Sequence, residues 1–181
     1  MPLALPTEQK ELQALVDRRH PRYHDRSGHW AFCRATHDGG RDWFKENLFR
    51  YHKEGKKEFA DRVARAYRFN HTREVVRLVT KYIFKGGVVR NTKDAPEAVR
   101  RFWRRATAKG AGIDALMRRV SDLTSIYGRC WLVVDSEVPV EGGPVTRKDE
   151  KDGRARIYAY TVSPEDMLDY SWDERGELRW A

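Results

Sequence analysis

The stretch DLTSIYGRCWLVVD, residues 122–135, decides the fold class, because the spacing of its apolar residues changes at Gly128. The apolar residues before and within its first half recur at helical spacing: Ile113, Leu116, Met117, Val120, Leu123 and Tyr127. After the glycine, the run from Cys130 to Val134 is continuously apolar, which is typical of a strand buried on both faces. The sequence therefore predicts a helix over 113–127, a stop at Gly128 and then a buried strand.

Helical patterns dominate the residues upstream of this stretch. They predict helices over 7–17, 30–36, 59–67, 75–83 and 94–106, with an aromatic segment over 43–51. Pro21 is expected to end the first helix, and Asp94 is expected to cap the last one in a capping box with Glu97. Asn70 and His71 are a plausible joint between two helices, although one long helix is also possible.

The residues downstream predict extended structure. Residues 140–153 are polar and glycine-rich, as in an exposed loop; residues 156–162 predict a strand, 163–166 a capped turn, and 168–180 a hairpin. The expected fold is α+β, with a mainly helical N-terminal two-thirds and then a small antiparallel or mixed β-sheet. We expect three regions: 1–56 helical and aromatic, 57–128 helical, and 129–181 β-rich. The bare edge of so small a sheet suggests a fragment of a longer protein.

The charge of the chain is strongly basic and unevenly distributed. The 181 residues carry a formal net charge of +9, which favours a polyanionic partner. Ten acids and seven bases give −3 from Pro139 onward, so the first 138 residues carry +12. Two distant cysteines make no disulfide framework, and no signal-peptide core or transmembrane-length apolar run is present. We therefore expect a soluble protein of intracellular origin.

Clustered cations on the predicted helix from Asp94 are the strongest binding signal. They are Arg100, Arg101, Arg104 and Arg105, followed by Lys109. On a helix these side chains lie opposite the apolar residues Val99, Phe102 and Trp103. The functional interpretation is a stripe facing DNA phosphates, whereas the alternatives are a solvated face or contacts with acids of a neighbouring subunit.

Two weaker patterns could carry metal chemistry. His29, Cys33 and His37 share one helix face at four-residue spacing and could offer three zinc ligands, but Gly39 and Gly40 suggest fraying there. Asp135 and Glu137 lie at the end of an apolar strand, a position where many nucleases bind magnesium. Acidic residues at strand ends are, however, usually just exposed to solvent. The sequence contains no Gly-rich phosphate loop and no Gly-x-Ser-x-Gly elbow, and we expect no catalytic residues and no cofactor.

The order of these segments resembles that of tailed-phage portal proteins. The resemblance rests on His29-Trp30 through Gly39-Gly40, on RAYRFNHTREVVRLVTKYIFKG (65–86), on the Tyr-Gly step into the strand, and on YAYTVSPEDMLDYSWDERGELRW (158–180). It extends from about His29 to the end of the chain. It looks like the N-terminal wing region of a portal, and no single motif within it is diagnostic.

This resemblance implies a non-enzymatic structural subunit. Portal subunits form a ring, usually a dodecamer, at one capsid vertex, through which double-stranded DNA is packaged and ejected. The implied partners are further copies of the chain, the major capsid protein, terminase, head-tail connector proteins and DNA, with no membrane. The implied location is the virion, after synthesis in the bacterial cytoplasm. The alternatives are a basic DNA-binding module and a metal-dependent nucleic-acid enzyme.

Overall fold

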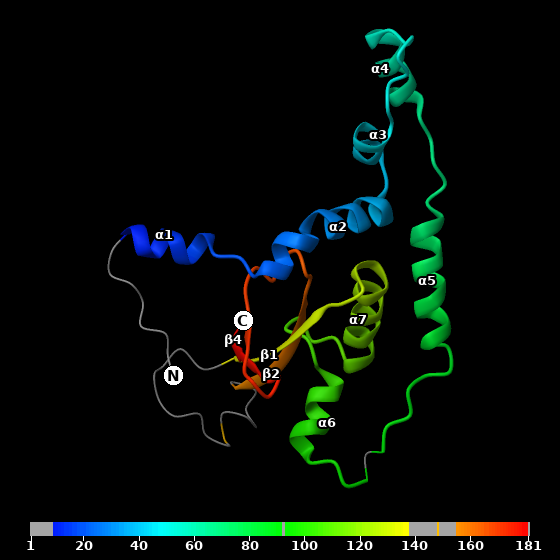
Figure 1. Cartoon of the computed structure of the whole chain (residues 1–181). Coiled ribbons are helices and arrows are strands. Elements are labelled where there is room, and N and C mark those ends of the chain that lie inside the picture. Colours follow the sequence, from blue (N-terminus) through cyan, green and yellow to red (C-terminus); the bar gives the residue numbers. More distant parts are fainter. Residues whose placement is uncertain (1–8, 92, 138–147, 149–154, 181) are drawn as a thin grey trace.

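A computed structural model describes residues 9–91, 93–137, 148 and 155–180 of the chain. Its helices are α1 (Gln9–Asp17), α2 (Pro21–Asp38), α3 (Arg41–Asn47), α4 (Lys56–Arg65), α5 (His71–Ile83), α6 (Glu97–Arg104) and α7 (Ile113–Tyr127). Four strands follow, namely β1 (Trp131–Glu137), β2 (Arg156–Val162), β3 (Ser171–Trp172) and β4 (Leu178–Trp180). The helices precede the strands, as Figure 1 shows, which confirms the predicted α+β class.

The strands form two separate antiparallel pairs. β1 pairs with β2 from Trp131 opposite Val162 to Glu137 opposite Arg156. β3 and β4 form a hairpin and are not hydrogen-bonded to the first pair among the described residues. The turn of the hairpin ends at Gly176, whose φ of 79° lies in the left-handed region that glycine tolerates. The predicted strand over 156–162 and the predicted hairpin are thus confirmed.

The prediction that β1 is buried on both faces is wrong. Leu132 and Val134 are 48% and 63% exposed. By the strand register they share a face with Ala159 of β2, which is fully buried against Ala106 and Leu116. Ala106, just after α6, and Leu116 of α7 pack on Ala159, whereas Leu132 and Val134 of β1 stay exposed on the same face.

Helix α7 is the centre of the helical packing. It contacts α2, α5, α6 and β2, which places it between the strands and the outer helices (Figure 1). Thr80 of α5 is buried against it and donates a hydrogen bond to Asp122 at 2.6 Å. Gly128 ends α7 in the left-handed conformation at φ 78°, as the change of sequence period predicts.

Two predicted helix starts are wrong and one predicted joint is confirmed. Pro21 does not merely end the first helix: it opens α2, because proline suits the first helical turn and the His20 side chain accepts a hydrogen bond from the Arg22 N–H. Helix α6 begins at Glu97 with the extended residue Pro96 at its N-cap, so Asp94 is not the cap.

Asn70 separates α4 from α5 and caps α5 by accepting from the Arg73 N–H. The loop predicted over 140–153 lies outside the described residues, Lys148 excepted.

Many large apolar side chains of the described residues are exposed to solvent. Phe49, Tyr51, Tyr67, Phe69 and Val89 are 67–97% exposed. Helices α1, α4 and α6 contain no fully buried residue. Apolar faces that ordinarily lie in a core are therefore in contact with solvent.

Candidate functional site

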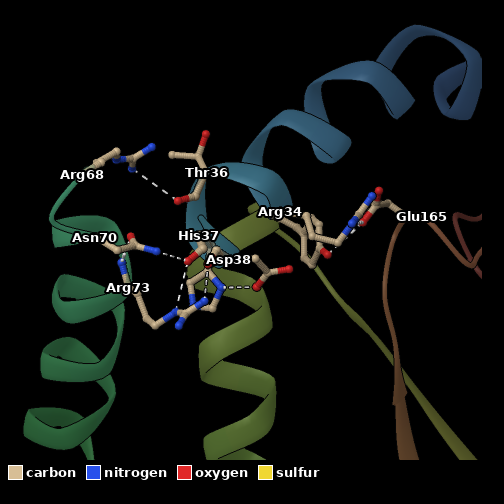
Figure 2. Close-up of polar contacts among 9 residues, drawn as sticks. Arg34, Thr36, His37, Asp38, Arg68, Asn70, Arg73 and Glu165 are labelled. Atoms are coloured by element: carbon tan, nitrogen blue, oxygen red, sulfur yellow. Dashed lines mark hydrogen bonds and ion pairs between the residues drawn. The ribbon is translucent and has the colours of Figure 1, made fainter. Parts of the chain in front are cut away.

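A network of side chains fixes the C-terminal end of α2 against the start of α5 (Figure 2). The carbonyl oxygens of residues 36–38 accept hydrogen bonds from Arg68, Asn70 and Arg73. These carbonyls lack partners within a helix, so the side chains satisfy them. The same Asn70 that caps α5 also closes α2, and the joint therefore sets the direction in which α5 runs.

A second network centres on Glu165, in the turn after β2. Its carboxylate accepts from Arg34 Nε of α2 at 2.9 Å and from the Tyr127 hydroxyl of α7 at 2.9 Å. Its carbonyl accepts from the Tyr23 hydroxyl at 3.1 Å. Burial, and then the hydrogen bond to Glu165, raises the pKa of Tyr127 well above its ordinary value. The hydrogen bond to Glu165 likewise raises the pKa of Arg34. Each of these polar groups has a hydrogen-bond partner within the network. The network therefore joins α2, α7 and the turn after β2.

The predicted arginine stripe is divided by local contacts. Arg100 folds back onto the carbonyls of Ala95 and Lys93, at 3.0 and 3.4 Å. Arg104 pairs with Glu97 at 2.8 Å, and Arg101 is half-buried with a contact of its own.

The last two cations of the stripe remain open to a partner. Arg105 and Lys109 are exposed, and the side chain of neither makes a hydrogen bond or an ion pair with a residue that the structure describes. Two of the five cations predicted from the sequence are thus available to a partner.

The three residues of the predicted zinc site are not brought together. His29 Nε2 lies 3.6 Å from Cys33 Sγ, but His37 Nδ1 turns to Asp38 at 3.0 Å. Across the described ranges, no group of three His, Cys, Asp or Glu residues is placed to hold a metal ion.

The strand-end acids contact neighbouring residues of the strand pair. Asp135 accepts from the hydroxyl of Tyr158, its cross-strand partner, at 3.0 Å and from the Ser136 N–H at 2.7 Å. Glu137 lies opposite Arg156 in the register of β1 and β2. Opposite charges in cross-strand positions stabilise a sheet, so these acids need no metal to explain them.

One feature without a contact that explains it is an exposed apolar face on α5, here called the α5 stripe. Its members are Val75, Leu78, Val79, Tyr82 and Ile83, which are 43–63% exposed. The adjacent side of the helix carries Val76 and Thr80, which are buried, and α5 contacts both α7 and α2. The periodicity that predicts this helix shows that it has an apolar side but not whether anything covers that side.

Helix α1 carries a second, shorter stripe, here called the α1 stripe, formed by Leu12, Leu15 and Val16. Leu12 and Val16 are 39% and 66% exposed, and α1 has no buried residue. The residues after the helix are nevertheless anchored: Arg18 pairs with Asp169 and lies 4.6 Å over the Trp180 ring. His20 stacks on the ring of Tyr170 at 4.0 Å between ring centres. This anchor forms one wall of an open hollow of about 480 Å³ beside the hairpin.

No protein-family model matches the chain, and no curated protein is significantly similar to it in sequence. None of the helices in the described part of the chain is both long and apolar enough to cross a bilayer.

Proposed function

We propose that the chain is a structural subunit of a homo-oligomeric assembly, and more specifically the wing portion of a tailed-phage portal subunit. The observation that carries the general part is the exposure of large apolar side chains on a described helix: Val75, Leu78, Val79, Tyr82 and Ile83 of α5 are 43–63% exposed. Apolar helical faces are stable in water only when something covers them, and in an assembly the neighbouring subunit does so.

The side-chain networks support a structural subunit over an enzyme. The best-connected polar groups, around Glu165 and at the end of α2, join elements to each other. Their hydrogen-bonding capacity is used within the protein, whereas a catalytic site keeps a nucleophile or base free towards a substrate. The expectation of a non-enzymatic protein therefore stands as part of the proposal.

The specific part of the proposal, a portal ring, rests on the order of segments in the sequence. The helix, the Tyr127-Gly128 step into an apolar strand, the Ser-Pro-Glu-Asp turn and the terminal hairpin follow one another as in portals. A virion location and partnership with capsid, terminase and connector proteins follow only from this resemblance.

Two observations test the portal proposal directly. Electron microscopy of the purified protein, expressed with its complete reading frame, should show rings with a central channel. The gene should lie between a large-terminase gene and a capsid-protease or major-capsid gene. Particles without rings, or a gene in a setting without packaging genes, would contradict the portal proposal.

A DNA-binding module is the second candidate, and the open cations Arg105 and Lys109 favour it. If they contact phosphates, duplex binding should weaken steeply with salt, and the double variant Arg105→Ala/Lys109→Ala should flatten the slope by about 2 in log–log units. Arg104→Ala is a matched control, because Arg104 is already paired with Glu97. Tight duplex binding by the monomer at physiological salt would place this candidate first.

A further inference from the structure

The open hollow beside the β3–β4 hairpin, here called the hairpin hollow, combines aromatic rings with arginines. Its volume is about 480 Å³, within the range of about 300–1,000 Å³ that is typical of small-ligand sites. Its walls come from two segments that are far apart in the sequence, the link between α1 and α2 and the hairpin itself. The lining residues with chemistry suited to a ligand are Arg18, Arg19, Tyr170, Trp172 and Trp180.

The two arginines of the hairpin hollow keep unused hydrogen-bond donors. Arg18 donates from Nε to Asp169, and its two terminal nitrogens make no hydrogen bond with the residues that the structure describes. Arg19 uses only Nη1, which donates to the carbonyl oxygens of Val16 and Arg18 at 2.6 and 2.8 Å. Its Nε and Nη2 likewise have no partner in the described ranges. Neighbouring guanidinium groups with free donors are suited to a phosphate, which accepts several such hydrogen bonds at once.

The hairpin supplies rings on which a planar ligand can stack. Trp172 is 48% exposed, and its ring stacks on Trp131 at 6.0 Å between ring centres, which supports it from within the protein. Trp180 is partly exposed, and the Arg18 guanidinium lies 4.6 Å over its ring. Exposed aromatic rings beside cations are the combination with which proteins bind unpaired nucleotides, because the base stacks and the phosphate pairs with the cation.

Tyr170 is a further sign that the hairpin hollow is more than a gap in the packing. The residue is 6% exposed, and its ring stacks on His20 at 4.0 Å between ring centres. Its hydroxyl is buried without a hydrogen-bond partner in the part of the chain that the structure describes. Most buried polar side-chain groups are hydrogen-bonded, so packing alone does not account for this hydroxyl.

We infer that the hairpin hollow binds one nucleotide of a single-stranded nucleic acid, with the base stacked on Trp172 and the phosphate held by Arg18 and Arg19. This activity goes beyond the structural role proposed above and does not depend on a ring. The net charge of +9 favours a polyanionic ligand.

Two other occupants fit the hairpin hollow less well. The bases of a duplex are stacked on one another, so they offer no free face to Trp172 unless the duplex opens. A proline-rich peptide would contact the aromatic rings but would leave the arginine donors without a partner.

The direct test measures binding of a fluorescently labelled short oligothymidylate to the full chain by fluorescence anisotropy. Binding should quench tryptophan fluorescence and weaken with salt, and the same sequence in a duplex should bind less tightly. Thymidine monophosphate should compete better than inorganic phosphate, because it supplies the base as well as the anion. Competition by the monophosphate as strong as that by the unlabelled oligonucleotide would identify a free nucleotide as the ligand and would overturn the assignment to a nucleic-acid strand.

Variants of the two walls separate stacking from charge. Trp172→Ala should bind the oligothymidylate at least about fivefold more weakly, whereas Trp172→Phe should retain most of the affinity because it keeps a ring. Arg19→Ala should also bind more weakly, and its salt slope should be smaller by about 0.7 in log–log units, the effect of one phosphate contact. Arg19→Glu should abolish binding without a change in the aromatic wall. Circular dichroism checks that each variant is folded.

Matched controls lie outside the hairpin hollow. Arg175→Ala removes an exposed cation from the turn of the same hairpin. Tyr82→Ala removes an aromatic residue that is 63% exposed and has Lys85 5.6 Å over its ring. Both controls should bind the oligothymidylate as the wild type does.

Three results would overturn the inference. The first is a wild type that does not bind the oligothymidylate. The second is a folded Trp172→Ala variant with unchanged affinity, together with equal competition by inorganic phosphate, which would mean that only a phosphate is held. The third is a loss of affinity in the two controls as large as in the variants of the hollow. Rings in electron micrographs are a separate observation, so the assembly proposal and this site can each fail alone.

Discussion

Tyr127 illustrates how one hydroxyl connects three elements. Its hydrogen bond to Glu165 joins α7 to the turn after β2, while Arg34 brings α2 to the same carboxylate. Tyr127→Phe removes that bond but leaves the ring, so we expect a loss of about 1 kcal/mol in the free energy of unfolding, measured by urea denaturation.

The control for this prediction is a tyrosine on the strands. Tyr160 is 42% exposed, and its hydroxyl makes no hydrogen bond with the described part of the chain. Tyr160→Phe should therefore leave the urea midpoint unchanged. Equal effects of the two substitutions would show that the Glu165 network does not stabilise the fold.

The ion pair between Glu54 and Arg62 predicts a specific pH dependence. Arg62 donates to both carboxylate oxygens, at 2.8 and 2.9 Å, and these hydrogen bonds lower the pKa of Glu54. A lowered pKa means that the stabilising contribution is present above the ordinary glutamate value of about 4.3 and is lost as the pH falls through the lowered value. Glu54→Gln should thus unfold at a lower temperature than the wild type at pH 7.

The same comparison at low pH is the internal control. At about pH 3, where the wild-type carboxyl is increasingly protonated, the difference in melting temperature between the wild type and Glu54→Gln should shrink. A difference that stays constant from pH 7 to pH 3 would mean that the charge of Glu54 does not contribute to stability. Because the pair connects the segment before α4 to α4 itself, local protease sensitivity there should follow the same pH trend.

At the scale of elements, two glycines should respond to alanine in opposite ways. Gly28 lies inside α2, and an added Cβ there meets nothing within 4 Å, so Gly28→Ala should stabilise the protein by about 1 kcal/mol. Gly128 ends α7 at φ 78°, and although the space around it is also open, alanine is strained in that conformation. Gly128→Ala should cost about 1 kcal/mol. Thermal unfolding of both variants measures the sign of each change.

The elements that the sequence predicts well are those defined by local signals. The change of period at Gly128 marks the end of α7, and Asn70 marks the joint between α4 and α5, since both residues act within a few positions of themselves. The predicted N-cap of α6, Asp94, is wrong. Asp94 and Pro96 both lie where the helix could begin, and in the structure the extended Pro96 occupies the N-cap position. The exposure of β1 was also missed, since coverage by other elements is not a local property.

The polar networks could not be found from the sequence for the same reason. Arg34 and Glu165 are 131 residues apart, and Tyr127 and Glu165 are 38 apart. Nothing in the residues around Arg34 indicates a partner at such a distance. The arginine cluster, in contrast, is evident from the sequence. In the structure, Arg100 and Arg104 bind local partners, and two cations of the cluster remain open to a partner.

At the scale of the whole molecule, the exposed apolar side chains predict a reduced heat capacity of unfolding. Side chains such as Leu78, Tyr82 and Ile83, which are 51–63% exposed in the folded chain, add less new area on unfolding than core side chains do. The heat-capacity change scales with the apolar area exposed on unfolding, and 181 residues ordinarily give about 2.2–2.7 kcal/mol/K. We therefore expect the monomer to fall below about 2.2 kcal/mol/K.

Differential scanning calorimetry at low protein concentration measures this value without interference from association. The wild type at high concentration should give a larger heat-capacity change per chain, since unfolding then also exposes the area buried between copies. Its melting temperature should rise with protein concentration, because association stabilises the folded chain by mass action. A monomer value of about 2.5 kcal/mol/K would instead mean that a single chain in solution covers its own apolar faces. In that case the need for a neighbouring subunit would disappear.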